Sequence, residues 1–292
     1  MSTPTRPAPS RRVLAVILSI LNAGAGHVAL GYPMRGVLWL AASFISTILC
    51  LAAILLSAPH PFWIIVVVVV SIRLSSIVVT VRSPLMDVSL GKAKAGILIV
   101  LMFVLMEFTS VLATTLIEAK RSPSESMYPG IWVGDHFYSS RKFLKLGRGD
   151  VILFEYPKDR SKLFSKRIVG VAGDTVQMID GQLILNGVPV SRRLTDESCA
   201  RNSRCKVWNE TLDGKSYRVM RLFDTGGNAP DFGPTTITPG HVFVLGDNRD
   251  NSLDSRFWGA LPVDLVKGNP LFVYWSSDES GIHWNRINQR IN

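Results

Sequence analysis

The amino-acid sequence predicts an N-terminal α-helical membrane anchor followed by a mainly β domain of folded antiparallel sheets, arranged as a partly open barrel. Apolar residues make up 47% of the 292 residues and are concentrated before about residue 117. Three apolar runs in this part reach the roughly 20 residues that a helix needs to cross a bilayer. After about residue 118, short runs of Val, Ile, Leu and Phe alternate with turn residues. We therefore expect a membrane region, 1–117, and a soluble domain, 118–292.

The three long runs, at about 37–57, 62–81 and 95–117, are predicted to be transmembrane helices. A fourth run, 13–30, has sufficient length, but Asn22 and several glycines interrupt its second half. We expect this segment to be re-entrant or interfacial. It is not interpreted as a cleaved signal peptide, because further spans follow it and no small-residue cleavage site comes directly after it.

Basic residues at the ends of these runs predict the orientation of the chain. The link 57–61 has no Lys or Arg, whereas the opposite ends of the runs carry Arg6, Arg11, Arg12, Arg35, Arg82, Lys92 and Lys94. By the positive-inside rule the basic side is cytoplasmic, so the chain after about residue 118 lies outside the cytoplasm. A formal charge of +10 suits an anionic lipid surface. Nucleic acid is not an expected partner, because the sequence has no clustered basic helix, zinc finger or RNA-binding aromatic signature.

Two polar residues stand out inside the apolar part. Arg73 interrupts the second span, where a charge is often functional, although an arginine can also extend its long side chain to the interface. His27 lies beside glycines, with no second His, Cys or carboxylate at ligand spacing. We favour structural roles for both residues, and we expect no metal and no cofactor.

The soluble part shows strand-like runs separated by turn signals. Asp180-Gly181 and Asn186-Gly187 are hairpin signals, because these residues reach positive φ at low steric cost. Strands are predicted within 150–157, 166–190, 241–248 and 270–275. Residues 191–238 are expected to form a polar, poorly periodic insertion. Within it, Cys199 and Cys205 have the close spacing of a small-loop disulfide in an oxidising compartment, the alternative being two free thiols in a surface loop.

A serine paired with a lysine is the remaining candidate for acyl-transfer chemistry, once histidine-based and metal-based hydrolases have been considered. The histidines of the soluble part belong to no nucleophile motif such as G-x-S-x-G, and H-E-x-x-H is absent. A lysine is a base only when neutral, so burial must lower its pKa from about 10.4. Lys166 lies in the apolar strand "FSKRIVGV", in which Lys166 and Arg167 point to opposite faces. One of the two is expected to enter the sheet interior and the other to meet solvent.

Four segments occur in order after the membrane region: "SPSESMYPG", "RGDVILFEYP", "KRIVGVAGDTV" and "GDNRDNSLDSRFWG". Together they closely resemble the conserved boxes of the bacterial type I signal peptidases, or leader peptidases, over most of residues 120–275. The resemblance implies a serine endopeptidase with a Ser-Lys dyad, which cleaves signal peptides from exported preproteins. It also implies a site at the outer face of the cytoplasmic membrane of a bacterium, with preproteins and membrane lipid as partners.

The resemblance assigns a role to each matching residue. It implies that Ser126 is the nucleophile and Lys166 the general base. Ser124 matches the hydroxyl that joins the backbone N–H of Ser126 in an oxyanion hole. Ser252 matches the serine that orients the lysine by a hydrogen bond. Asp254 and Arg256 match a supporting ion pair.

The sequence departs from the family pattern in two places. Gly130 stands where the family often has threonine, which should alter local hydrogen bonding without removing a catalytic group. The N-terminal region is longer and more hydrophobic than the usual anchor of one or two spans. Two alternatives therefore stay open: a specialised processing peptidase with a narrow substrate set, or a catalytically inactive membrane scaffold. A self-cleaving repressor of the LexA type would need a DNA-binding domain where this chain has apolar spans.

Overall fold

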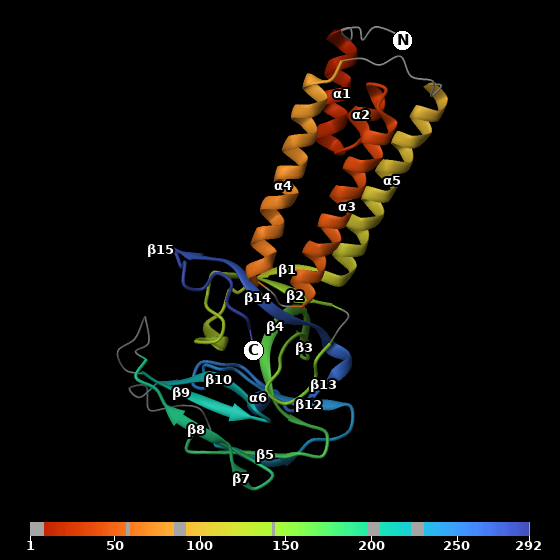
Figure 1. Ribbon diagram of the computed structural model, residues 1–292. Helices are drawn as coiled ribbons and strands as arrows, with labels where there is room; N and C mark the ends of the chain where they lie inside the picture. Colours follow the sequence, from red (N-terminus) through yellow and green to blue (C-terminus); the bar gives the residue numbers. More distant parts are fainter. Residues whose placement is uncertain are drawn as a thin grey trace. The chain divides into compact units, whose positions relative to one another are not determined.

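A computed structural model describes residues 9–56, 59–84, 92–141, 144–197, 205–222 and 231–291. The chain divides into two compact units, Met1–Leu116 and Ile117–Asn292, each of which is described here by itself. The first is helical and the second is built mainly of antiparallel strands (Figure 1). The predicted fold class is confirmed, but the sheets do not close into a barrel.

The first unit contains five helices in its described residues: α1 (Pro9–Leu21), α2 (Ala25–Ala29), α3 (Pro33–Leu55), α4 (Pro59–Arg82) and α5 (Lys92–Leu116). By length and composition, α3 and residues 93–116 of α5 are each able to cross a membrane. α4 has 24 residues, about 36 Å of helix at 1.5 Å per residue. Many large apolar side chains on α3, α4 and α5 are exposed, among them Leu38, Leu74 and Phe108. An exposed apolar surface of this kind is suited to lipid.

The predicted interruption of the first apolar run coincides with a break in the helix. α1 ends at Leu21, and the side-chain oxygen of Asn22 accepts a hydrogen bond from the backbone N–H of Gly24 at 3.1 Å. A Cβ at Gly24 would collide with the backbone of Gly36 on α3, so a glycine is needed where the two segments meet. α1 and α2 lie beside only one end of α3, α4 and α5 (Figure 1). Their placement in a membrane stays a prediction.

The second unit has three sheets, in which the named strands pair antiparallel. The largest has the order β1-β2-β14-β3-β4-β12-β13, with β15 paired to β14: β1 (Ile117–Arg121), β2 (Asp135–Ser140), β14 (Val266–Asp278), β3 (Val151–Tyr156), β4 (Asp159–Val171), β12 (His241–Leu245), β13 (Leu261–Pro262) and β15 (Gly281–Ile282). The second has the order β11 (Phe232–Thr236), β5 (Thr175–Ile179), β6 (Gln182–Leu185) and β7 (Val188–Pro189). The third has the order β10 (Lys215–Leu222), β9 (Cys205–Leu212) and β8 (Ser191–Leu194). The short helices are η1 (Glu125–Met127), α6 (Ser255–Trp258) and η2 (Val263–Leu265).

The predicted Asp-Gly and Asn-Gly hairpins both form. Asp180 and Gly181, with φ of 49° and 67°, join β5 to β6. Asn186 and Gly187, with φ of 54° and 79°, join β6 to β7. All four residues occupy the left-handed region that a tight hairpin requires.

Residues 191–238, predicted as a polar and poorly periodic insertion, contain four strands in their described part, β8 to β11. Sequence periodicity misses them because charged residues occupy inward positions. Glu210 on β9 has no exposed surface, and its carboxylate accepts a hydrogen bond from the Tyr217 hydroxyl at 2.8 Å. A buried charge at an inward position makes a strand look irregular to any test based on apolar alternation.

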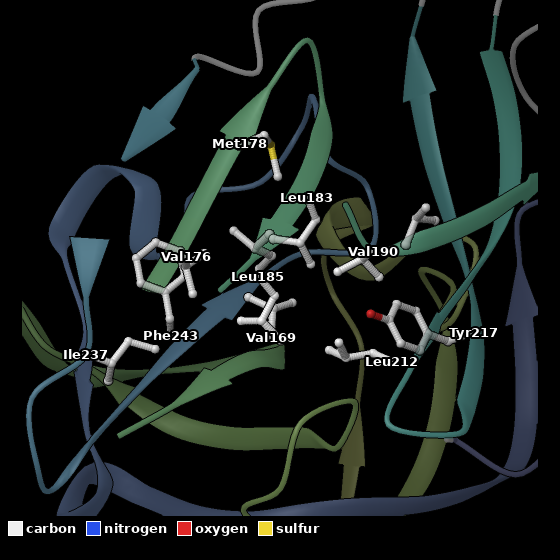
Figure 2. Close-up of a cluster of buried hydrophobic side chains, with 12 residues drawn as sticks. Val169, Val176, Met178, Leu183, Leu185, Val190, Leu212, Tyr217, Ile237 and Phe243 are labelled. Atoms are coloured by element: carbon white, nitrogen blue, oxygen red, sulfur yellow. The ribbon is translucent and has the colours of Figure 1, made fainter. Parts of the chain in front are cut away.

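Strand β4 lies between two apolar cores because its alternate residues face opposite sides. Val169 belongs to a cluster that unites β4, β5, β6, β10 and β12, shown in Figure 2 with Leu183, Tyr217 and Phe243. Ile168 belongs to a second cluster with Phe154 and Val244 among others. Both faces of β4 are therefore buried at this point, just beyond Lys166 and Arg167.

Candidate active site

The serine box forms a tight turn after β1. Ser124 is the N-cap of η1, and its Oγ accepts a hydrogen bond from the backbone N–H of Ser126 at 3.1 Å. The backbone N–H of Tyr128 donates to the carbonyl of Glu125 at 2.9 Å and closes the turn. An N-cap serine stabilises a helical turn by satisfying one of its free N–H groups. The capping interaction also fixes the position of Ser126 at the end of the exposed loop.

Lys166 and Ser126 meet across 40 residues of sequence. The Lys166 Nζ donates a hydrogen bond to the Ser126 Oγ at 2.6 Å. Lys166 is on β4 and only 3% exposed, and its Nζ lies 5.4 Å from the centre of the Phe164 ring. The structure thus brings together the two residues that the resemblance pairs as base and nucleophile.

Burial lowers the pKa of Lys166 to about 8, because a desolvated ammonium is less stable than a neutral amine. The negative charges of Asp254 and Asp247 act in the opposite direction, and the positive charge of Arg256 lowers the pKa further. A large fraction of Lys166 is therefore neutral at mildly alkaline pH. A neutral amine 2.6 Å from a serine hydroxyl is able to accept its proton.

The two predicted oxyanion groups lie next to each other, but they are bonded to one another. The backbone N–H of Ser126 donates to Ser124 Oγ and does not point into an empty site. The hydroxyl proton of Ser124 is not used in that bond, since Oγ is the acceptor. In this arrangement the Ser124 hydroxyl can donate directly to an oxyanion. The Ser126 N–H must first release Ser124 Oγ before it can donate to the same oxyanion.

The loop after β12 packs against the backbone of the nucleophile. The backbone N–H of Asn248 donates to the carbonyl of Ser126 at 3.2 Å. A Cβ at Gly246 would collide with both the Ser126 carbonyl and the Ser252 side chain. The glycine therefore allows the loop to approach the nucleophile closely, and it places Ser252 beside the dyad.

The hydrogen bond predicted between Ser252 and Lys166 is not formed in this structure. The Ser252 Oγ is buried and makes no hydrogen bond with any residue that the structure describes. Lys166 Nζ instead points to Ser126. A hydroxyl left in such a position is costly unless a partner arrives, since a buried unsatisfied group loses its water.

Asp254 and Arg256 form the predicted ion pair. Two hydrogen bonds of 2.8 Å join the guanidinium to the carboxylate, and both side chains are essentially inaccessible. Asp254 also caps α6 and accepts the backbone N–H of Gly246 at 3.0 Å. The pair therefore holds the loop that carries Gly246 and Ser252.

The expectation that Lys166 or Arg167 would meet solvent is wrong. Arg167 is 2% exposed and makes a two-pronged ion pair with Asp247, with N–O distances of 2.8 and 2.7 Å. Its third donor binds the carbonyl of Gly149 at 2.7 Å, and its guanidinium stacks on the Tyr217 ring at 3.9 Å. Strand alternation places the two residues on opposite faces, but the second face is covered by β10.

Asp247 and Arg249 are site residues that sequence reasoning missed. Arg249 is buried and pairs with Glu210 at 3.2 and 2.6 Å, and its Nε donates to the Gly246 carbonyl at 3.1 Å. Both residues belong to the same box, "GDNRDNS", as Ser252. The alternation of acidic and basic residues in that box was the available signal, because charges in an apolar surrounding need partners.

Gly130 lies against Asp247. A Cβ at this position would collide with the Asp247 Oδ2 and would lie 3.2 Å from the Met127 carbonyl oxygen. A threonine in its place would thus have to displace the carboxylate that holds Arg167. The local packing around Asp247 therefore suits a glycine at position 130, where the family often has threonine.

Cys205 begins β9, whereas Cys199 lies outside the described residues. The pairing of these two cysteines stays a prediction. Cys50, on α3, is a free thiol.

Comparisons with known proteins identify the family of this chain. The family model described as "Signal peptidase, peptidase S26" matches residues 94–275. A signal peptidase I from Pseudomonas fluorescens is 31% identical over 195 residues, which cover 58% of this chain and 68% of that protein. A signal peptidase I from Pseudomonas aeruginosa is 33% identical over 174 residues, which cover 53% of this chain and 61% of that protein.

A chloroplast relative and a solved structure extend the comparison. The thylakoidal processing peptidase 1 of Arabidopsis thaliana is 32% identical over 204 residues, 65% of this chain and 50% of that protein. A crystal structure of a signal peptidase I from Enterococcus faecalis is 26% identical and covers 43% of this chain and 97% of its own, with a TM-score of 0.28. On the family match and the curated relatives, this chain belongs to the signal peptidase family, peptidase S26, whose members are serine endopeptidases.

Proposed function

We propose that this chain is a membrane-bound serine endopeptidase that removes N-terminal signal peptides from exported preproteins. The single observation that carries the mechanism is the 2.6 Å hydrogen bond between Lys166 Nζ and Ser126 Oγ, made by a lysine that is 3% exposed. A buried lysine beside a serine hydroxyl has the lowered pKa that a general base requires.

The chemistry follows from this arrangement in two steps. Neutral Lys166 accepts the proton of Ser126 while Oγ attacks the scissile carbonyl, and the resulting ammonium then protonates the leaving amine. Lys166, neutral again, next takes a proton from a water molecule that attacks the acyl-enzyme, and it returns this proton to Ser126 Oγ as the ester bond breaks and the new carboxyl end leaves. The negative oxygen formed in each step is stabilised by the Ser124 hydroxyl and the Ser126 N–H. One such donor contributes about 3 kcal/mol.

The two ion pairs near Lys166 support its role as a base. Asp254 and Asp247 would each favour the protonated form of the lysine. Each carboxylate is held by its own arginine, Arg256 or Arg167, at less than 3 Å. The net charge of each pair is close to zero, so desolvation remains the largest influence on the lysine.

The substrate is proposed to bind as an extended strand beside Ser126, with small side chains before the cut. Strand addition supplies affinity through backbone hydrogen bonds and leaves specificity to shallow pockets. The catalytic unit is proposed to lie outside the cytoplasm, since the basic ends of the predicted spans favour the cytoplasmic side. A disulfide between Cys199 and Cys205 is compatible with that compartment.

A specialised peptidase with a narrow substrate set is the second candidate. The family model begins at residue 94, so most of the helical unit lies outside the matched region. In this second candidate, the helical unit outside the matched region selects the substrate. The inactive scaffold is less well supported, because both members of the dyad are present and in contact.

Cleavage of a purified preprotein by the full-length protein tests the proposal. We expect Ser126→Ala and Lys166→Ala each to lower kcat by roughly three orders of magnitude or more, because members of a dyad act as a unit. Lys162→Ala is a matched control on the same strand, since Lys162 is exposed and paired with Asp159. Undiminished cleavage by the Lys166 variant would exclude the Ser-Lys mechanism. Absence of cleavage by the unmodified protein would favour the scaffold.

A further inference from the structure

The helical unit contains a pocket whose lining is partly polar. The pocket lies between α3, α4, α5 and the break that separates α1 from α2. Its polar lining consists of Asn22, Ser43, Thr47, Arg73 and Thr109. α3 packs against both α4 and α5, whereas α4 and α5 make little direct contact in their described parts. The pocket therefore lies where the bundle is open between α4 and α5.

Arg73 and Ser43 are the donors that this pocket offers. Arg73 makes one long hydrogen bond, from Nη1 to the carbonyl of Leu21 at 3.4 Å, and forms no ion pair with a described residue. Ser43 is 8% exposed, and its hydroxyl makes no hydrogen bond within the described chain. Thr47 and Thr109 donate their hydroxyl protons to carbonyls of their own helices, at 2.8 and 2.7 Å. The pocket therefore offers the positive charge of Arg73 and the hydroxyl of Ser43, and no acidic residue is among the described residues that line it.

The two donors lie at similar depth. Ser43 is ten residues after Pro33 at the start of α3, and Arg73 is nine residues before Arg82 at the end of α4. At 1.5 Å per residue both are about 15 Å from helix ends that the basic residues predict to be cytoplasmic. The hydrocarbon core is about 30 Å thick, so this depth is close to its middle.

We propose that this pocket binds the carboxyl end of the helical segment of a signal peptide, an inference that rests on the proposed function. The apolar segment of a signal peptide has about 7 to 15 residues, or roughly 10 to 22 Å of helix. Such a helix starts at the cytoplasmic face and ends inside the bilayer. Its last four carbonyls have no partner there, and they carry the negative end of the helix dipole. Arg73 and Ser43 supply the donors and the charge that this end lacks.

The depth of the pocket favours a helix end over a lipid headgroup. Arg73 and Ser43 lie about 15 Å from the helix ends that are predicted to be cytoplasmic, close to the middle of the hydrocarbon core, whereas lipid headgroups lie at its two faces. The helix itself would occupy the open side between α4 and α5, where Leu105 lines the pocket and presents exposed apolar surface.

The test compares two substrates of the full-length protein in vesicles of neutral phosphatidylcholine. One is a preprotein with a complete signal peptide, and the other is a short soluble peptide that contains only the residues around the cut. We expect Arg73→Gln to raise KM for the preprotein about threefold to fifteenfold, the range of hydrogen bonds between helices in membranes, and to leave kcat unchanged. The short peptide should be cleaved with unchanged kcat and KM. Arg73→Lys should raise KM for the preprotein less than Arg73→Gln does, because lysine retains the positive charge.

Matched controls separate binding from folding. Ser43→Ala should raise KM for the preprotein, whereas Ser46→Ala should not, because Ser46 is equally buried but donates to a carbonyl of its own helix and lies outside the pocket. Arg82→Gln removes an exposed arginine from the last turn of the same helix and should leave KM unchanged.

Three results would overturn the proposal. An unchanged KM for the preprotein with Arg73→Gln would exclude the contact. An equal change with both substrates would assign Arg73 a structural role. An effect that appears only when anionic lipid is added would assign the pocket to a lipid headgroup.

A different result would show that the proposed function itself is wrong. In that case the unmodified protein cleaves neither substrate. Binding can still be measured with the Ser126→Ala variant, carrying a photo-crosslinking amino acid in place of Leu105 at the pocket. Crosslinking to the carboxyl end of the apolar segment, and its loss with Arg73→Gln, would support the pocket independently of cleavage. No crosslink to that segment would refute it.

Discussion

The guanidinium of Arg249, in the loop after β12, donates two hydrogen bonds to the carboxylate of Glu210 on β9, 39 residues earlier in the chain. The exposed fractions of the two side chains are 1% and 0%. The same arginine holds the Gly246 carbonyl, and Gly246 packs against the backbone of Ser126. The sheet β8–β9–β10 is thereby linked to the loop that supports the nucleophile.

Breaking this pair should destabilise the protein strongly. We expect Glu210→Gln to lower the free energy of unfolding of the second unit by about 3 to 5 kcal/mol, because an unpaired buried arginine remains. Glu197→Gln is the control, since Glu197 pairs with Arg218 at a site where their side chains are 48% and 33% exposed. Its effect should be within about 1 kcal/mol. Chemical denaturation checks both, and similar losses for the two variants would contradict the role of burial.

The pH dependence of cleavage should report Lys166. Burial lowers the pKa of this lysine to about 8, and only its neutral form can accept the proton of Ser126. We expect kcat/KM to be low below pH 7, to rise through a half-maximal value near pH 8 and then to level off. Measurement of kcat/KM against pH with a purified preprotein tests this expectation. Activity that falls over this range would exclude a lysine base.

Removing Arg256 should move that profile. Its positive charge lowers the pKa of Lys166, and it neutralises Asp254, whose negative charge raises the same pKa. With Arg256→Gln the lysine therefore remains protonated to higher pH, and the rising limb should shift to more alkaline values. The double variant Asp254→Asn/Arg256→Gln should shift it back, since both charges are gone. An unshifted limb in the single variant, measured under conditions where it remains folded, would show that the pair acts only on structure.

A side chain at position 130 should disturb the site. In Gly130→Ala the new Cβ collides with the Asp247 carboxylate, which holds Arg167. We expect a loss of about 1 to 3 kcal/mol in stability, the usual cost of overpacking, together with reduced cleavage. Gly96→Ala is the control, because a Cβ there meets nothing within 4 Å. Thermal unfolding and an activity assay check the two variants, and equal behaviour would show that Asp247 can move aside freely.

Local patterns predicted much of the fold. The hairpins at Asp180-Gly181 and Asn186-Gly187 form because two adjacent residues are enough to set a turn. The long apolar runs coincide with helices, because backbone hydrogen bonding within a helix needs no distant partner. The strands of 191–238 were missed, because Glu210 is an inward-facing charge whose partner, Arg249, is remote in sequence.

The candidate chemistry could be predicted from the amino-acid sequence: a serine box, a lysine in an apolar strand, and an apolar region before them. These are properties of short segments, and the family resemblance rests on the same residues. Which groups meet, and how they are charged, follows from the tertiary fold. The 2.6 Å contact of Lys166 with Ser126, the burial of Arg167 against Asp247, and the unpartnered hydroxyl of Ser252 all depend on it. They depend on it because burial and hydrogen bonding are set by chain segments 40 to 123 residues apart, which strand alternation alone does not locate.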